Sequence, residues 1–165
     1  MSSTMITLLI CLALTGAGLM AGVYFAFSGF IMRSFDQLGA TQATNAMNAI
    51  NEVILRSWFM ALFLGSTLLF TILSAVALFD TELPGRWLLM TIGLIYVIGM
   101  FGSTAVFNVP LNNRLADVPE DENGVSNNWA LYYRNWTRWN HIRGVCSLVS
   151  MVLSVYYLLY YLSCD

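Results

Sequence analysis

The stretch "NNWALYYRNWTRWNHIRGVCSLVSMVLSVYYLLYYL", residues 127–162, decides the fold class. Its second part, residues 142–162, is apolar for the roughly 20 residues that a helix needs to cross the hydrocarbon core of a bilayer. Its first part holds tryptophans, arginines, asparagines and the only histidine of the chain, and no proline separates the two parts. The stretch therefore predicts one long helix that crosses a membrane and extends beyond it.

Three other segments are long and apolar enough to cross a bilayer, namely residues 5–32, 58–79 and 87–107. Hydrophobic residues make up 58% of the 165 residues and charged residues 10%, whereas about 25% of an average soluble chain is charged. The turn "DTELPGR", residues 80–86, is so short that the second and third spans must be antiparallel neighbours. We therefore predict an all-α integral membrane four-helix bundle that forms one domain over residues 1–165.

The two longer connections are predicted to be largely helical. Apolar residues at positions 46, 47, 50, 53 and 54 share one helical face, which predicts an amphipathic extension of the second span over about residues 41–57. Residues 126–141 extend the fourth span in the same way, so two long helices should project beyond the membrane. Residues 116–127 read as a true loop, and Val109, which precedes Pro110, predicts a kink or break.

The arginines predict the orientation, because short cytoplasmic loops are enriched in basic residues. Six of the seven flank the two long connections and one flanks the short turn. Both long connections should therefore face the cytoplasm, with both termini outside it, in the inner or plasma membrane if the protein is bacterial. No basic run is present, so we expect no nucleic-acid partner. The six are Arg33, Arg56, Arg114, Arg134, Arg138 and Arg143, and the seventh is Arg86.

A polar stripe runs down the last helix and should face the interior of the bundle, where polar groups can find partners. His141 lies about 100° around the helix from the stripe, and the sequence leaves its direction open. A buried arginine needs a partner, for which asparagine carbonyls and Glu52 are available. The stripe consists of Trp129, Tyr133, Trp136, Asn140, Arg143, Ser147, Ser150 and Ser154.

Several of these residues also have a purely structural interpretation. Trp58, Trp87 and Trp129 are typical interfacial anchors, and asparagines often cap helices or join them by hydrogen bonds. Gly18 and Gly22 form a G-x-x-x-G pattern, which lets helix backbones approach closely in lipid. That pattern predicts a contact within the bundle or, alternatively, a homo-oligomer.

Four motifs give the chain a family resemblance: "AGVYFAFSGFIMRSFD", "AMNAINEVI", "FNVPLNNRLA" and "WTRWNHIRG". In this order and spacing they resemble the anthrone oxygenase-like family of small membrane proteins, long catalogued as a domain of unknown function. The resemblance implies an activity like that of fungal relatives, which are implicated in oxidising anthrones to anthraquinones. The positions that it marks are Tyr24, Arg33, Asn48, Asn51, Asn108, Asn112, Trp136, Asn140, His141 and Arg143.

Two functions from different classes follow. The first is a membrane-embedded oxygenase for a lipophilic aromatic, anthrone- or quinone-like compound. His141 would act as general base, and Arg143 with Asn140 would stabilise a developing enolate oxygen. The second is a non-enzymatic membrane protein that binds a hydrophobic ligand, haem or a partner protein.

The cofactor of the oxygenase is left open by the sequence. Haem ligated by His141 is the leading candidate, since one histidine suffices as an axial ligand, and a cofactor-free reaction is the alternative. A zinc or non-haem iron site is disfavoured, because one histidine and few carboxylates cannot build the usual ligand set.

Overall fold

The computed structural model describes residues 2–117 and 122–163, and within these residues all regular structure is helical. Four helical stretches are long and apolar enough to cross a membrane, which confirms the prediction of an all-α chain with four such helices. They are Ser3–Gln37, Trp58–Phe79, Arg86–Ala116 and Gly124–Leu162. The elements in chain order are α1 (Ser3–Ala26), η1 (Phe27–Ile31), α2 (Met32–Gln37), α3 (Ala40–Ile54), α4 (Trp58–Phe79), α5 (Arg86–Tyr96), η2 (Val97–Gly102), η3 (Thr104–Asn108), α6 (Val109–Ala116) and α7 (Glu122–Leu162).

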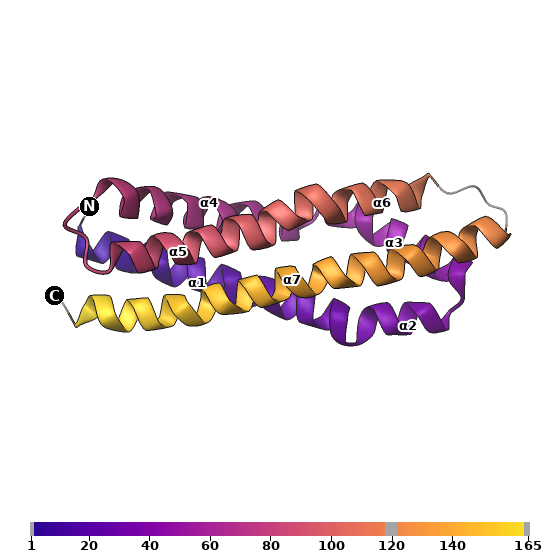
Figure 1. Cartoon of the computed structure of the whole chain (residues 1–165), viewed down its shortest axis with the longest axis horizontal. Helices are drawn as coiled ribbons and strands as arrows, with labels where there is room; N and C mark the ends of the chain where they lie inside the picture. The colour runs from indigo at the N-terminus through magenta and orange to yellow at the C-terminus, as the bar shows by residue number, and fades with distance from the viewer. Residues whose placement is uncertain (1, 118–121, 164–165) are drawn as a thin grey trace.

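The helices run up and down along one axis, so that the two chain ends lie at the same end of the bundle (Figure 1). The elements α2, α3, α6 and the start of α7 gather at the other end. Phe70, Tyr96 and Tyr157 are fully buried between the helices, whereas Leu12 and Phe25 are among many large apolar side chains that face outward. An apolar outer surface of this kind is suited to lipid rather than water.

Small residues bring the helix backbones close together. A Cβ atom on Gly16 of α1 would lie 2.8 Å from Cβ of Ser66 on α4. A Cβ atom on Gly93 of α5 would lie 2.8 Å from the backbone oxygen of Phe70 and would overlap the Ser74 hydroxyl. Because lipid tails are as apolar as the side chains, close packing of this kind is a main source of helix association in a bilayer.

Gly93→Ala should therefore destabilise the protein by about 1–3 kcal/mol, because α5 must move away from the α4 backbone to make room for the methyl group. The measurement is the free energy of unfolding in mixed micelles. The matched control is Gly65→Ala on α4, whose added methyl group meets no atom within 4 Å. The control should be neutral or up to about 1 kcal/mol more stable, since alanine is the better helix former. Equal stability of the two variants would contradict the close approach of α4 and α5.

The bundle has four legs, each of which runs from one end to the other. The second leg, residues 40–79, differs from the continuous helix that the sequence predicts over residues 41–79. A turn over residues 55–57 separates α3 from α4. Ser57 stabilises this turn, because its hydroxyl donates to the Ile54 carbonyl at 2.8 Å and accepts from the Phe59 N–H at 3.2 Å. Serine is a favoured N-cap residue, and this capping signal competes with the apolar periodicity around it.

The third leg shows the opposite difference, because it continues through Pro110 without the expected break. Val109 keeps helical backbone angles, with φ −62° and ψ −47°, and its N–H bonds to the Thr104 carbonyl five residues back. Pro110 is the second residue of α6, where the missing N–H is tolerated at the start of a helix. A π turn before the proline thus replaces the predicted kink.

The fourth leg starts earlier than expected, because α7 begins at Glu122 and residues 122–127 are helical rather than part of the predicted loop. Residues 118–121 of that loop, Pro119 included, lie outside the described residues. Trp129 is not an interfacial anchor, since it is buried and its Nε1–H donates to Asp36 Oδ1 at 2.9 Å. Trp58 and Trp87 are exposed, as anchors should be.

Candidate functional site

Arg143 on α7 is a buried cation, with only 6% of its surface exposed. Its Nη2 donates to Asn140 Oδ1 at 2.7 Å, and its guanidinium carbon lies 4.5 Å from the ring centroid of Tyr24 and 5.0 Å from that of Trp136. No carboxylate of the described residues forms an ion pair with it, and the expected partner Glu52 is exposed. The positive charge is thus held by an amide oxygen and two aromatic faces.

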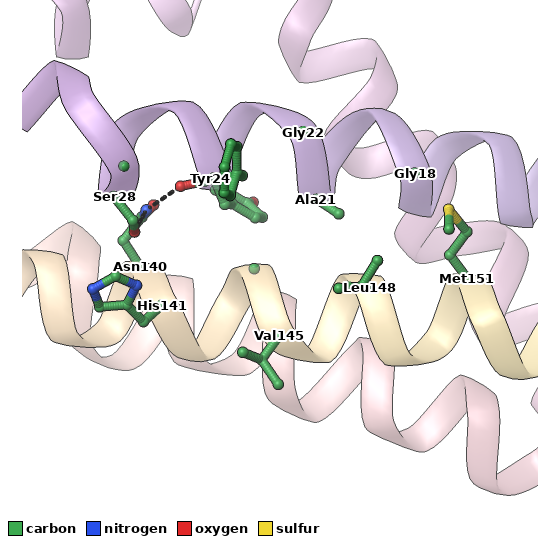
Figure 2. Close-up of a pocket in the computed structure, with 13 residues that line it drawn as sticks. Gly18, Ala21, Gly22, Tyr24, Ser28, Asn140, His141, Val145, Leu148 and Met151 are labelled. Atoms are coloured by element: carbon green, nitrogen blue, oxygen red, sulfur yellow. Dashed lines mark hydrogen bonds between the residues drawn. The ribbon is translucent and has the colours of Figure 1, made fainter.

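Asn140 connects this arginine to α1. The side chain is fully buried, and its Nδ2 donates to the Tyr24 carbonyl at 2.7 Å and to Ser28 Oγ at 2.6 Å. Figure 2 shows this amide pointing from α7 across to α1. Its oxygen accepts from Arg143, so the two bonds that its nitrogen donates, one to α1 and one to η1, fix which way the amide faces. Asn140 therefore positions the guanidinium as well as joining two helices.

Several buried polar atoms near Arg143 have no hydrogen-bond partner among the described residues. Two of them are N–H donors on residues that are more than nine-tenths buried, namely Arg143 Nε and Trp136 Nε1. Native proteins leave few such atoms unpaired, because each costs about 1–3 kcal/mol. The set points to a polar ligand group or ordered water at this place. The others at this end of the bundle include Thr44 Oγ1, Asn48 Oδ1, Asn51 Nδ2, Asn108 Oδ1 and Thr137 Oγ1.

An interior cavity of about 220 Å³ adjoins the arginine; it is not fully enclosed, since the exposed residues Leu55 and Val109 belong to its lining. Its wall is mostly apolar and aromatic, with a few polar groups, which is the usual make-up of a small-molecule site. Phe27 from η1, Leu55 from the α3–α4 turn and Thr104 from η3 all line it, so each of the first three legs departs from a regular α-helix beside the cavity. Single π turns inside helices are frequent at functional sites. The lining residues include Tyr24, Phe27, Met47, Asn51, Leu55, Phe59, Met60, Phe63, Thr104, Asn112, Trp136, Asn140 and Arg143.

Six of the ten positions marked by the sequence line this cavity: Tyr24, Asn51, Asn112, Trp136, Asn140 and Arg143. Asn108 and Asn48 do not line it. Asn108 is buried and its Nδ2 donates to the Trp136 carbonyl at 3.3 Å, whereas Asn48 is half-buried on α3. Arg33 is exposed on α2 and borders neither this cavity nor the groove described below.

His141 is exposed and does not line the interior cavity. It borders instead a second hollow, a groove of about 490 Å³ between α1 and α7 (Figure 2). The floor of this groove is made of small and apolar residues, among them Gly18, Gly22 and Val145. The arrangement separates the histidine from the arginine, although the two are close in sequence.

The G-x-x-x-G pair lies along the same groove. A Cβ atom on Gly18 would meet the sulfur of Met151 on α7 at 2.9 Å, whereas one on Gly22 would meet no atom within 4 Å. The first glycine thus allows a contact within the chain, and the second faces open space. A homo-oligomer through this pair stays a prediction.

Some residues in or next to the cavity wall escaped the sequence analysis. Tyr132 rather than Tyr133 is buried in the first part of α7, and its hydroxyl donates to Asn112 Oδ1 at 2.9 Å. It lies four residues before Trp136, so the 3,4 alternation of the stripe allows either tyrosine. Ser28 and Thr104 gave no signal, because single hydroxyls in an apolar span are common and usually bond to their own helix, as Thr104 does to the Met100 carbonyl at 2.7 Å.

Comparison with known families gives one match. A model of a family described as anthrone oxygenase matches residues 56–153, which is more than half of the chain. The matched region contains Trp136, Asn140 and Arg143 but not Tyr24 or Asn51 of the cavity wall. No curated protein and no solved structure matches the chain.

Proposed function

Because the chain belongs to the anthrone oxygenase family, we propose that it oxidises a lipophilic aromatic carbon acid of the anthrone type in the interior cavity. The observation that carries this proposal is Arg143, a buried cation beside a mostly apolar cavity, which has no ion pair and no hydrogen-bond partner for its Nε among the described residues. A charge held in this way is costly for folding, which points to a use in function.

The chemistry of the wall suits such a substrate. The aromatic side chains Phe27, Phe59 and Phe63 can pack against fused rings, and the guanidinium of Arg143 can receive a carbonyl oxygen. The volume lies below the roughly 300–1,000 Å³ that is usual for pockets of drug-sized ligands, so one compact ring system is the class of ligand that fits. Four helices that can cross a membrane match a substrate that partitions into the bilayer.

The proposed step starts with the transfer of a proton from the ring carbon opposite the substrate carbonyl to a water molecule. The resulting anion carries its charge largely on the carbonyl oxygen, where a fixed cation in a water-poor site stabilises it strongly. The carbanion form then reacts with O₂ and takes the proton back as a hydroperoxide. One oxygen atom stays as the new carbonyl, and the other leaves as water with both hydrogens of the original carbon.

This reaction balances without an electron donor. The substrate loses four electrons, O₂ gains four, and an anthrone plus O₂ gives an anthraquinone plus water. The described lining residues of the cavity include no carboxylate and no imidazole. Arg143 would therefore promote proton loss by lowering the pKa of the substrate itself, rather than by passing the proton to a side-chain base.

The predicted roles of His141 as general base and as haem ligand do not fit this geometry. A haem on His141 would lie in the groove, on the other side of the Tyr24–Asn140 wall from Arg143. We therefore propose the cofactor-free form, and we derive no step through haem. The sequence-based orientation, with the arginine-rich end in the cytoplasm, is kept as part of the proposal.

Oxygen uptake with anthrone tests the proposal. The protein in lipid nanodiscs should consume one O₂ per anthraquinone formed, well above spontaneous autoxidation, and should show no Soret band. His141→Ala should keep its rate within about threefold of wild type, because this residue lies outside the cavity. A Soret band that disappears in His141→Ala would make this a haem protein. Anthrone binding without oxygen uptake above the background would favour the non-enzymatic ligand-binding function.

A further inference from the structure

We propose that the groove between α1 and α7 is the port through which a lipophilic aromatic ligand passes from the bilayer into the interior cavity, and that the Asn140–Ser28 hydrogen bond is its latch. This inference rests on the proposed function only in taking the cavity as the destination of a ligand.

The groove and the cavity share a wall. Tyr24 and Asn140 line both hollows, so the partition between them is formed by a tyrosine from one helix and an asparagine from the other. The cavity side of this partition carries Arg143, whose Nε is buried and unpaired. A ligand that entered the groove would therefore need to displace few side chains to reach that donor.

The groove opens on the face of the bundle that is suited to lipid. Phe25, Val145 and Leu148 border it and are exposed apolar residues of membrane-crossing helices. Figure 2 shows Leu148 and Met151 pointing from α7 toward α1 along the groove. A ligand dissolved in the bilayer would meet this apolar surface without first entering water.

The partition contains a helix segment that is not regular. Ser28 lies in the π turn η1, and the Tyr24 carbonyl accepts from both the Phe27 N–H and Asn140 Nδ2. The bond of Asn140 to Ser28 Oγ, at 2.6 Å, joins two side chains and can break without unwinding either helix. Once that bond is broken, the Tyr24 carbonyl is the one remaining partner of Asn140 on α1, so the asparagine side chain is freer to swing out of the partition.

Gly22 offers a way to fill the port without touching the cavity. It lines the groove only, and a Cβ atom there meets nothing within 4 Å. Gly22→Leu should therefore be accommodated and should narrow the path from the bilayer. Gly65→Leu on α4 is the matched control, because Gly65 also has open space around its Cβ position and lines neither hollow.

The test measures access to the cavity without requiring turnover. Thr104→Cys places a thiol on the cavity wall away from the groove, and N-phenylmaleimide serves as a planar apolar probe in nanodiscs. Peptide mass analysis at position 104 separates its labelling from that of the native cysteines. Gly22→Leu should slow the labelling by about tenfold, Gly65→Leu should leave it unchanged, and Ser28→Ala should speed it by about threefold.

Each outcome decides the proposal. Equal rates in the Gly22→Leu and Gly65→Leu backgrounds would mean that ligands enter by another route, and no labelling at all would mean that the wall is closed; either overturns the port. A cooperative unfolding transition for each variant serves as the check that it folds. If Gly22→Leu fails to fold, the labelling rate of Ser28→Ala still tests the proposal through the latch. Groove-dependent labelling in a protein that fails to oxidise anthrone would keep the port and reject only the proposed reaction.

Discussion

Arg143→Met is expected to abolish anthrone oxidation while the protein stays as stable as the wild type or becomes more stable. The activity should fall by about 10²–10³-fold, the size of effect seen when a main electrostatic contact to a developing oxyanion is removed. Stability should not fall, because an arginine inside a membrane costs about 3 kcal/mol or more. Arg143 recovers part of this cost through one hydrogen bond and two aromatic faces, without an ion pair among the described residues.

Oxygen uptake and thermal unfolding of Arg143→Met, measured in the same nanodiscs, give the two readouts. Arg138→Met is the matched control, because Arg138 lies on the same helix and is exposed. The control should change neither activity nor stability much. A large drop in the unfolding temperature of Arg143→Met would identify the arginine as a structural lock, which is the role that the non-enzymatic interpretation assigns to it. Full activity in this variant would reject the proposed oxyanion contact.

Asn140→Ala is expected to lower both activity and stability. The change removes three hydrogen bonds, two of them buried, leaves Arg143 Nη2 without its amide partner and opens a small void. We expect a loss of about 2–4 kcal/mol in the free energy of unfolding. Activity should fall as well, because the guanidinium would lose the group that positions it. Asn127→Ala, on an exposed site of the same helix, should have little effect.

A double variant separates the two roles of Asn140. In the Arg143→Met background, Asn140→Ala should cost about 1–2 kcal/mol less than in the wild type, because no guanidinium is then left unpaired. If the losses in free energy of unfolding of the two single variants add up to that of the double variant, Asn140 stabilises the protein only through its hydrogen bonds to Tyr24 and Ser28. The pair of measurements thus distinguishes a residue that positions the arginine from one that merely joins two helices.

The sequence predicted the fold class well because a bilayer constrains it strongly. Apolar length alone locates the four helices that can cross a membrane, and the 3,4 spacing of the stripe on α7 places Asn140 and Arg143 on the buried face. The features that it missed are decided by local hydrogen bonds. Ser57 ends α3 and starts α4 through two short-range hydrogen bonds, and a π turn before Pro110 lets the third leg stay helical. Neither feature changes the spacing of apolar residues in the sequence.

The candidate site was harder to predict, since a rotation of about 100° separates neighbours on a helix. Asn140 is fully buried and His141 is exposed, although both fall in one polar motif. Arg33 shares a motif with Tyr24, but it lies on the exposed side of α2. Sequence proximity therefore grouped residues that the helix geometry separates, and only the tertiary arrangement tells the cavity from the groove.

The interruptions in the helices have a mechanical consequence. α7 is one regular helix of 41 residues, whereas each of the other three legs changes its winding or breaks beside the cavity. The bundle thus combines one continuous, stiff helix with three helical stretches that are interrupted and therefore easier to bend. Arg143 and Asn140 both belong to α7, so we expect the polar end of the site to keep its place while the apolar walls adapt to the ring system of the proposed substrate.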